Sequence, residues 1–523
     1  IVTLPISLWF KFERVQAVPC IEITRGEAVD VARVALGQRN FSLPDNSRAL
    51  TGVIGAPNIQ DRFVWELSGE ATYESLVDSW LHPPRYTVRF AQFEGDIAER
   101  AEEWLVYVSG DGSVRNVMHN LPEDAAGATL TEEDARLLAT RTIEEELGFR
   151  ADSLKEISVA PERHPNRTDW GFTFEYTGND SLPALPDGGQ YRVFATIAGD
   201  GVASYGRYVY VPEEWARKIQ GDITGTIISV LTNVLVIGSL VVAAIMAIVV
   251  WSRGRFPVRL FWWTLGAMLV TSLLSFGNNF PIAESAFFTS QSYGTQILTV
   301  AIGGVIGMGA LSAALGLAGG LGGSWRTCRT NASDLQLILT ATALGCCFVG
   351  SRAIMFGAEA TLPNWPVTGP AGTYAPWGAT LLAGVLGLIR LAIFTVLLVG
   401  LVDRFSQGWT EQRGLAVLVL FLAGGIAYAS TSSNVITTWL LYAALSGVML
   451  VIGYIFLARY DLAVVPVWVG TVLAINIATN TAEFPGDTLA AILGSLVVFV
   501  TGIGAFLLLR QSTSSNAMEG EPI

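Results

Sequence analysis

The sequence predicts an α-helical polytopic membrane bundle of about nine spans, preceded by an N-terminal α+β domain outside the cytoplasm. The first observation is charge: residues 1–222 hold 35 acidic and 21 basic side chains, whereas the rest of the chain is nearly neutral. The second is hydropathy, because long apolar runs begin only after Asp222. A charged region followed by an apolar one is typical of a water-soluble domain attached to helices in lipid.

Nine apolar runs are long enough to cross about 30 Å of hydrocarbon at about 1.5 Å per residue. They lie within a predicted bundle over 223–510. We place them at 223–250, 258–276, 295–323, 335–357, 376–402, 414–432, 435–457, 462–480 and 487–509.

Basic residues beside the runs orient the bundle. The odd-numbered runs are followed by Arg253, Arg255, Arg259, Arg326, Arg329, Arg404, Arg413, Arg459 and Arg510. The alternate connections, 277–294, 358–375, 433–434 and 481–486, contain no lysine or arginine. Because cytoplasmic loops carry the excess of basic residues, we expect residues 1–222 to be extracytoplasmic and the tail 511–523 to be cytoplasmic. The expected location is a bacterial plasma (inner) membrane.

Residues 1–20 are expected to hold the remnant of a signal sequence or N-terminal anchor, and a linker. Ile1 to Phe10 is apolar and is followed by Lys11, as at the end of such a segment. A short buried strand is the alternative.

The outer domain contains an internal repeat, over residues 21–125 and 126–222. In the first unit, Thr24 and Glu27 have the spacing of a helix capping box, and Trp104–Val108 is a strand followed by a Gly-Asp-Gly turn and a second strand. The second unit repeats this order with a helix over Thr131–Leu147, a strand over Tyr191–Ala198, another Gly-Asp-Gly turn and a last strand. Each unit resembles a PepSY-type domain, which implies binding or regulation. A purely structural α+β spacer remains the alternative.

A polar stretch in the second unit is a candidate recognition loop for a peptide or a lipid headgroup. Its candidate residues are Arg163, Arg167, Asp169 and Trp170. The alternative, which we favour, is a solvated turn in which Trp170 is the first buried residue of a strand.

Three segments within residues 376–480 resemble the CAAX prenyl endopeptidase and bacteriocin-processing (CPBP) family of intramembrane proteases. VLGLIRLAIFTVLLVGLVDR (385–404) resembles the family's Glu-Glu-x-x-x-Arg helix, and VLFLAGGIAYAS (419–430) resembles the helix ending in Phe-x-x-x-His. VMLVIGYIFLARYDLAVVPVWVGTV (448–472) resembles the glycine-rich span and the final histidine-bearing helix. The resemblance implies an intramembrane metallo- or glutamic-type endopeptidase.

The residues at the matching positions differ from those of the family. The paired glutamates fall among Leu388, Ile389 and Arg390. The first histidine falls at Ala427 or Tyr428 and the second at Val469. The three histidines of the chain, His82, His119 and His164, all lie in the outer domain. Without a carboxylate base or metal ligands, this chemistry cannot be assembled. We therefore expect a catalytically silent relative, with no catalytic residue, cofactor or metal.

Polar residues within the spans are candidates for ligand binding. Arg352 and Arg390 are mid-span, and a charge there costs about 2.5–3.5 kcal/mol on insertion scales, so such residues usually face a partner. Together with Glu359, Tyr428 and Asn476 they are predicted to line a polar cavity for a lipid headgroup or an unwound peptide. The alternative is that each arginine is structural or extends to an interface.

The sequence favours a protein that binds or scaffolds membrane or envelope peptides, proteins or lipids. One alternative is an active intramembrane peptidase with relocated groups such as Glu359 or Glu284. A second is a lipid or small-solute transporter. The lipid bilayer is an expected partner, whereas nucleic acid is not, because phosphate binding needs basic patches and residues 1–222 are strongly acidic.

Overall fold

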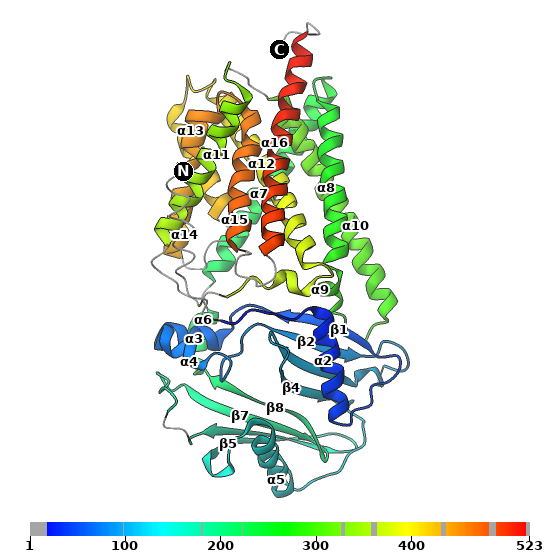
Figure 1. Ribbon diagram of the computed structural model, residues 1–523. Coiled ribbons are helices and arrows are strands. Elements are labelled where there is room, and N and C mark those ends of the chain that lie inside the picture. The colour runs from blue at the N-terminus through cyan, green and yellow to red at the C-terminus, as the bar shows by residue number, and fades with distance from the viewer. Residues whose placement is uncertain are drawn as a thin grey trace.

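The computed structural model describes residues 18–97, 99–178, 181–221, 223–325, 330–356, 363, 365–429, 436–480 and 488–518. A helical bundle stands end-on upon an α+β domain that contains two antiparallel sheets (Figure 1). Eight described helices are long and apolar enough to cross a membrane. These features are those of a multi-pass membrane protein with an N-terminal α+β region.

The first sheet has the order β1-β2-β3-β4, and all neighbouring strands are antiparallel. Its elements are α2 (Arg25–Gln38), β1 (Arg48–Ile54), α3 (Ile59–Ser68), α4 (Glu70–Leu76), β2 (Arg85–Ala91), β3 (Glu103–Ser109) and β4 (Val114–Asn120). The predicted capping box of Thr24 and Glu27 is confirmed, as is the hairpin that contains Trp104–Val108. Helix α2 packs Ala28 and Leu36 against strand β2, which forms a core on one face of the sheet.

The second sheet repeats this arrangement in the order β5-β6-β7-β8. Its elements are α5 (Glu132–Thr142), extended by a π-turn over Ile143–Leu147, β5 (Leu154–Arg163), β6 (Thr168–Tyr176), β7 (Gln190–Ala198) and β8 (Gly201–Tyr210). The predicted second helix and its hairpin are confirmed. Phe63 of α3 and Tyr73 of α4, from the first unit, join the core beneath this second sheet. The two units therefore share a core.

Three strands of the two sheets were not predicted from the sequence. The expected repeat was a helix and a hairpin, with a further strand from Trp170 in the second unit, so β6 is confirmed and β1, β2 and β5 are additions. Strand β5 is largely exposed along its length, so it lacks the apolar alternation that identifies a half-buried strand. As a result, the polar stretch at residues 163–170 forms the turn between two strands rather than a link between a helix and a strand.

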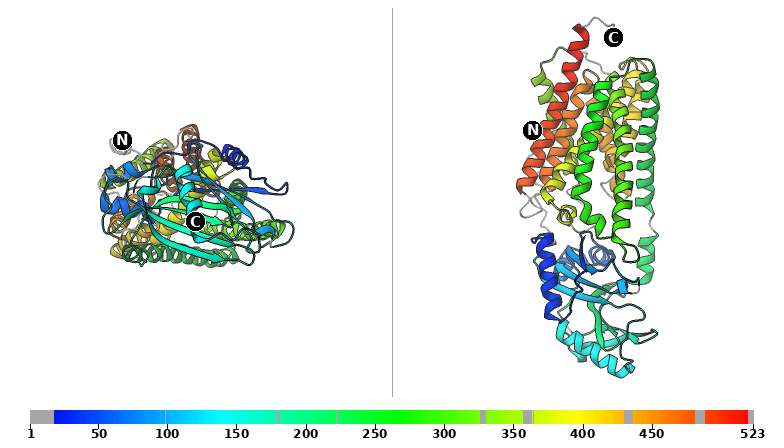
Figure 2. Two further views of the ribbon diagram at one scale, coloured as in Figure 1. Left: turned by 90° about the horizontal axis from the view of Figure 1, so that it is seen from below. Right: turned by 90° about the vertical axis from the view of Figure 1, so that its right-hand side faces the viewer.

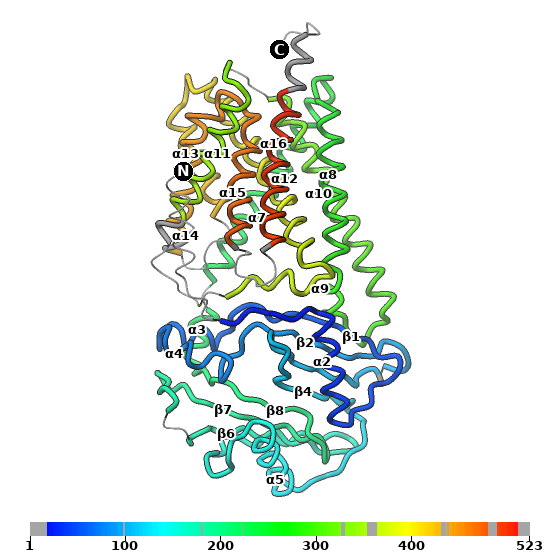
Figure 3. The backbone as a smooth tube through the Cα atoms, viewed as in Figure 1, coloured from blue at the N-terminus to red at the C-terminus, as the bar shows by residue number. Residues whose placement is uncertain are grey.

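The bundle follows a short helix, α6 (Glu213–Gln220). Its helices are α7 (Thr224–Ser252), α8 (Val258–Asn278), α10 (Tyr293–Ser324), α11 (Asp334–Phe356), α12 (Pro376–Phe405), α13 (Arg413–Ala429), α14 (Ile436–Gly453), α15 (Val465–Asn480) and α16 (Thr488–Met518). Each coincides with a predicted apolar run. Helix α13 is too short in its described part to count among the eight candidate spans. Helix α16 runs from the end of the bundle near the α+β domain towards the opposite end (Figure 3).

Two connections between helices of the bundle contact the first sheet, at the boundary between the bundle and the α+β domain (Figure 2, right). The connection between α8 and α10 contains α9 (Phe280–Glu284), and Phe287 just after it packs with Leu50 of β1. In the connection between α11 and α12, the carbonyl of Ala371 accepts a hydrogen bond from Tyr86 at 3.3 Å. Both connections lack lysine and arginine, so the N-terminal α+β domain lies on the side of the bundle where the connections without basic residues lie.

Candidate functional site

A small hollow lies inside the bundle, where four helices meet. It is lined by Phe348 of α11, Tyr428 of α13, Ser446 and Leu450 of α14, and Trp468, Val469 and Val472 of α15. The space between these side chains has no room for a water molecule. The lining is apolar apart from two hydroxyl groups and the indole N–H of Trp468, so this part of the bundle is closely packed.

The hollow brings together positions that the protease resemblance had singled out. Tyr428 and Val469, the positions matched to the two family histidines, both line it. Leu388, at the position of the paired glutamates, belongs to the same hydrophobic core as Val469. The Cδ1 atom of Leu388 would lie 3.7 Å from a Cβ atom placed on Gly470 of α15, which is an ordinary packing distance. Helices α12, α13 and α15 therefore converge at this point with apolar side chains in contact.

Tyr428 is the most polar residue of the hollow. Its hydroxyl lies 2.6 Å from Thr395 Oγ1 on α12, and Thr395 in turn donates to the carbonyl of Leu391. The ring of Tyr428 packs edge-on against Phe348, with 5.8 Å between centroids. Within the described ranges, no group of three or more His, Cys, Asp or Glu side chains is arranged to hold a metal ion. The hollow thus offers hydroxyl groups but no side chain that titrates near neutral pH.

The two intramembrane arginines lie apart from the hollow lining. The guanidinium of Arg352 stacks over the ring of Tyr442 on α14, 4.8 Å from its centroid, which is a cation–π contact. Its predicted neighbour Glu359 lies outside the described residues. Arg390 is exposed at the middle of α12, and among the described residues no hydrogen-bond or ion-pair partner is found for it. Asn476 is half-buried on α15 and does not line the hollow.

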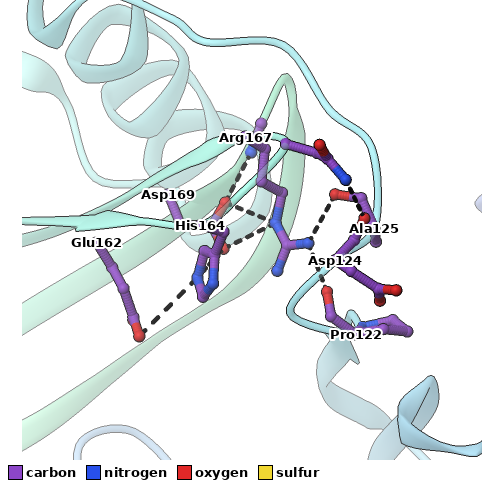
Figure 4. Close-up of polar contacts among 9 residues, drawn as sticks. Pro122, Asp124, Ala125, Glu162, His164, Arg167 and Asp169 are labelled. Carbon is purple, nitrogen blue, oxygen red and sulfur yellow. Dashed lines mark hydrogen bonds and ion pairs between the residues drawn. The ribbon is translucent and has the colours of Figure 1, made fainter. Parts of the chain in front are cut away.

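The polar stretch of the outer domain is folded into a set of internal contacts (Figure 4). Arg167 is only 4% exposed and pairs with Asp169 at 3.0 Å. Its Nη1 atom donates to the carbonyls of Pro122 at 2.5 Å and Ala125 at 3.0 Å. These carbonyls belong to the link between the two units, so Arg167 fastens the β5–β6 turn to that link.

The remaining residues of this stretch divide between inward and outward positions. His164 lies 3.1 Å from Asp169, and a carboxylate oxygen of Asp169 also accepts from the backbone N–H of Gly199 at 3.0 Å. Trp170 is half-buried and donates to the carbonyl of Leu130 at 3.2 Å. Arg163 alone of the four candidate residues is exposed. The geometry is that of a structural turn, although Arg167 is buried rather than solvated as we had expected for a turn.

A chain of hydrogen bonds that was not predicted from the sequence joins the N-terminal α+β domain to the bundle. Trp365, in the connection between α11 and α12, donates to the hydroxyl of Tyr73 at 3.0 Å. Tyr73 donates to the carboxylate of Asp61 at 3.1 Å. Asp61 is 1% exposed, and burial raises its pKa to about 6 against the opposing effect of its hydrogen bonds. The capping box of Asn58 and Asp61 was the one local signal in the sequence, but it does not reveal the link to Trp365.

Glu284, considered as a relocated catalytic group, lies in the other docked connection. Its carboxylate accepts a hydrogen bond from the hydroxyl of Tyr293 at the start of α10. The Tyr293 ring also lies under the guanidinium of Arg48 from β1, at 4.0 Å. Glu284 is therefore part of the contact between the outer domain and the bundle.

Comparison of the chain with models of known protein families, with curated proteins and with solved structures finds no match.

Proposed function

We propose that the bundle is a non-hydrolytic relative of the CAAX prenyl endopeptidase and bacteriocin-processing proteases that binds or scaffolds membrane or envelope peptides, proteins or lipids. The observation that carries the proposal is the apolar hollow. Tyr428 and Val469, at positions matched to the family's histidines, line it, and Leu388, at the position of the paired glutamates, belongs to the same hydrophobic core.

The chemistry of these side chains supports binding rather than cleavage. Hydrolysis of a peptide bond needs a water molecule and a base or metal to activate it. The hollow has no room for water, and the polar groups of its lining are the hydroxyls of Tyr428 and Ser446 and the indole N–H of Trp468, none of which is a carboxylate, imidazole or thiol. A tyrosine or serine hydroxyl does not ionise near neutral pH without a neighbouring base.

We also propose how the helices cross the membrane and which domain type the two N-terminal units resemble. Nine crossings, with α13 as the short one, place residues 1–222 outside a bacterial plasma membrane and the C-terminus inside. The support is that the connections lacking basic residues contact the outer domain, as Phe287 and Ala371 do. The two four-stranded units would be PepSY-like, and their shared core suits a rigid binding or regulatory module.

Arg390 is the residue that we propose contacts the ligand. A guanidinium at mid-span is costly when it has no partner, and none is found for Arg390 in the described part of the chain. A carboxylate or phosphate on a bound peptide or lipid would offset this cost. Arg352, by contrast, already has the ring of Tyr442 as its neighbour.

The test uses the full chain in proteoliposomes with a fluorescent transmembrane peptide that carries one mid-span glutamate. We expect saturable capture and intact peptide by mass spectrometry. Arg390→Leu should weaken capture, whereas Arg413→Leu at the start of α13 should not. Equal loss of folded protein and of capture in Arg390→Leu would reduce this arginine to a structural role.

Chelator-sensitive turnover would establish the peptidase alternative, and solute uptake would establish the transporter.

A further inference from the structure

Each sheet of the α+β domain carries a helix on one face only. Strands β3 and β4 pack against α2, and strands β6 and β7 pack against α5 with its π-turn. In the part of the chain that the structure describes, these are the helices that pack on β3, β4 and β7. Side chains alternate between the two faces of a strand, so every second residue of these strands lies on the face opposite the helices.

A connected row of residues on this opposite face crosses from one sheet to the other. Tyr107 of β3 is directly opposite Asn116 of β4, and Phe194 of β7 is directly opposite Gly206 of β8. Strands β4 and β8 lie side by side, and a Cβ atom placed on Gly206 would be 3.7 Å from Asn116 Nδ2. These four residues therefore form one continuous row across the junction of the two sheets.

Gly206 gives the row a flat centre. A Cβ atom placed on Gly206 would lie 2.8 Å from Cε1 and 3.0 Å from Cζ of Phe194, which is closer than non-bonded carbon atoms pack. The end of the Phe194 ring thus occupies the space above Gly206, so the ring lies across β8. The ring of Tyr208, two residues further along β8, is 6.1 Å away between centroids. Phe194 is half-buried, so part of its ring faces solvent.

An arginine lies over an aromatic ring at each end of the row. The guanidinium of Arg85 is 5.3 Å from the centroid of the Tyr107 ring, and that of Arg192 is 3.5 Å from the centroid of the Tyr210 ring. Arg192 is also directly opposite Tyr208. We call the whole set the aromatic surface: Arg85, Tyr107, Asn116, Phe194, Gly206, Tyr208, Arg192 and Tyr210.

Both charged side chains of the aromatic surface are positive, in a region that holds 35 acidic and 21 basic residues. Within the described ranges, no hydrogen bond or ion pair is found for the guanidinium of Arg85. The charge of Asp61 reaches Arg85, but Asp61 is buried and accepts its hydrogen bond from Tyr73. Arg85 therefore keeps its donors for another acceptor.

Arg192 is held by a neutral group. Its Nε and Nη2 atoms donate to the amide oxygen of Gln190, at 2.9 and 2.7 Å. Glu175 is directly opposite Arg192 on β6, but its carboxylate pairs with Lys155 of β5 at 3.1 Å. The positive charge of Arg192 is therefore oriented on the surface without a carboxylate bound to it.

We propose that the aromatic surface binds an acidic protein segment, whose carboxylates pair with Arg85 and Arg192 and whose apolar side chain packs on Phe194. The solvated face of an antiparallel sheet is ordinarily polar. Tyrosine, phenylalanine and arginine are instead the residues enriched in protein interfaces and their hot spots. A guanidinium also matches the two oxygens of a carboxylate in a bidentate pair.

The size and charge of the surface define the segment further. The row runs from β2 to β7 over four strand spacings of about 4.8 Å, or about 20 Å, which an extended segment of about six residues spans. Its positive charge argues against a second copy of the same surface as the partner, because like charges would face each other. The surface is separate from the hollow and from Arg390, so this inference goes beyond the function proposed above.

The first experiment selects short peptides from a displayed library on the full chain in phosphatidylcholine nanodiscs. Each position of the library is drawn from aspartate, lysine, serine, leucine and phenylalanine. We expect the enriched peptides to carry at least two aspartates with an apolar residue between them. Enrichment of basic or uncharged peptides, or no enrichment, would overturn the proposal.

The second experiment measures the affinity of an enriched acidic peptide by fluorescence anisotropy. Arg192→Gln should raise the Kd by at least about tenfold through loss of a charge-assisted pair. Arg163→Gln, which replaces an exposed arginine elsewhere in the same domain, should bind like the wild type. An equal Kd for Arg192→Gln and the wild type would overturn the proposal. Dimers of the full chain that form without peptide and are lost in Arg192→Gln would assign the surface to a second copy and would also overturn it.

Gly206→Ala tests the flat centre without removing a contacting group. The added methyl group should displace the flexible end of the Phe194 ring, so the affinity should fall several-fold while the melting temperature stays near that of the wild type. Gly171→Ala on β6 is the matched control, because the nearest atom, the carbonyl oxygen of Ala160, would be 3.7 Å from its Cβ. This control should bind like the wild type. Unchanged affinity in Gly206→Ala would show that the peptide does not dock on this surface.

Discussion

The α+β domain and the hollow inside the helical bundle differ in their use of buried charge. In the outer domain Arg167 and Asp61 are almost fully buried and are surrounded by hydrogen-bond partners. In the bundle, the hollow is lined by apolar side chains, two hydroxyl groups and the indole of Trp468, with no charged side chain. Buried charges stabilise contacts in the α+β domain, and elsewhere in the bundle at Asp403 and Asp461, whereas the hollow is held by packing.

This difference bears directly on function. A charged group in a dry interior is stable only with close partners, and removing one partner leaves the other buried and unpaired. The charged catalytic groups of a protease that cleaves within a membrane carry the same free-energy cost of burial. Val469 and Leu388 are buried apolar side chains and carry no such cost. The following predictions test the two halves of this comparison, from the largest expected effect to the smallest.

Replacing Arg167 with alanine should lower the free energy of unfolding of the outer domain by about 3–5 kcal/mol. The change removes the ion pair with Asp169 and two hydrogen bonds to the link between the units. Chemical unfolding of the full chain in detergent, followed by tryptophan fluorescence, measures the loss. Arg163→Ala is the control and should change stability by less than about 0.5 kcal/mol. Similar small effects in both variants would mean that the turn is not fastened by charge.

Replacing Leu388 with alanine should destabilise the bundle by about 2–5 kcal/mol through lost packing, without creating activity. Leu388 is 3% exposed in the large core of the bundle, and the resulting cavity would be lined by apolar side chains. Thermal unfolding in detergent measures the effect, with exposed Leu401→Ala on the same helix as the control. A variant as stable as the wild type would show that packing at this point does not hold the bundle together.

The buried carboxyl group of Asp61 predicts an unusual dependence of stability on pH. Because its pKa is raised to about 6, the folded state binds the proton more tightly than the unfolded state does. The protonated carboxyl group of Asp61 therefore stabilises the folded state fully below about pH 4. As the pH rises towards 6, the free energy of unfolding falls by up to about 3 kcal/mol.

Asp61→Asn should remove that contribution from the pH profile of the unfolding free energy. The difference between variant and wild type should grow in favour of the variant between pH 4 and 7. Asp152→Asn, which removes an exposed carboxylate that pairs with Arg150, serves as the control. Parallel profiles for Asp61→Asn and the wild type would show that Asp61 titrates like an exposed carboxylate.

Trp365→Phe should have the smallest effect, a loss of about 1 kcal/mol from the contact between the outer domain and the bundle. The substitution keeps an aromatic ring but removes the donor to Tyr73. Hydrogen exchange at helix α4 should become faster, whereas exchange at α5, in the second unit, should not change. Faster exchange throughout the outer domain would mean that the substitution disturbs the whole fold.

The helical spans were predictable because a run of about twenty apolar residues is a strong local signal. The β3–β4 and β7–β8 hairpins were predictable because a Gly-Asp-Gly turn separates their strands. Strand β5 gave no such signal, since an exposed strand needs no apolar alternation. The contact of Trp365 with Tyr73 joins residues 292 positions apart, and no local pattern encodes it.

Only part of the candidate sites could be predicted from the sequence. The protease resemblance pointed to Tyr428 and Val469, which do line one hollow, but the residues alone gave no sign that the hollow is dry. Arg167 was read as a candidate contact residue because a polar stretch near aromatic residues resembles a recognition loop. Only the fold reveals that its donors are used by Pro122 and Ala125.

Incorporation of heavy oxygen tests the central claim most directly. The full chain is incubated in proteoliposomes with a transmembrane peptide in water enriched in ¹⁸O, and peptide fragments are analysed by mass spectrometry. Our account predicts that the peptide stays associated and intact, with no fragment carrying a labelled carboxylate. Labelled fragments cut within the membrane segment, absent when the protein is left out, would contradict it.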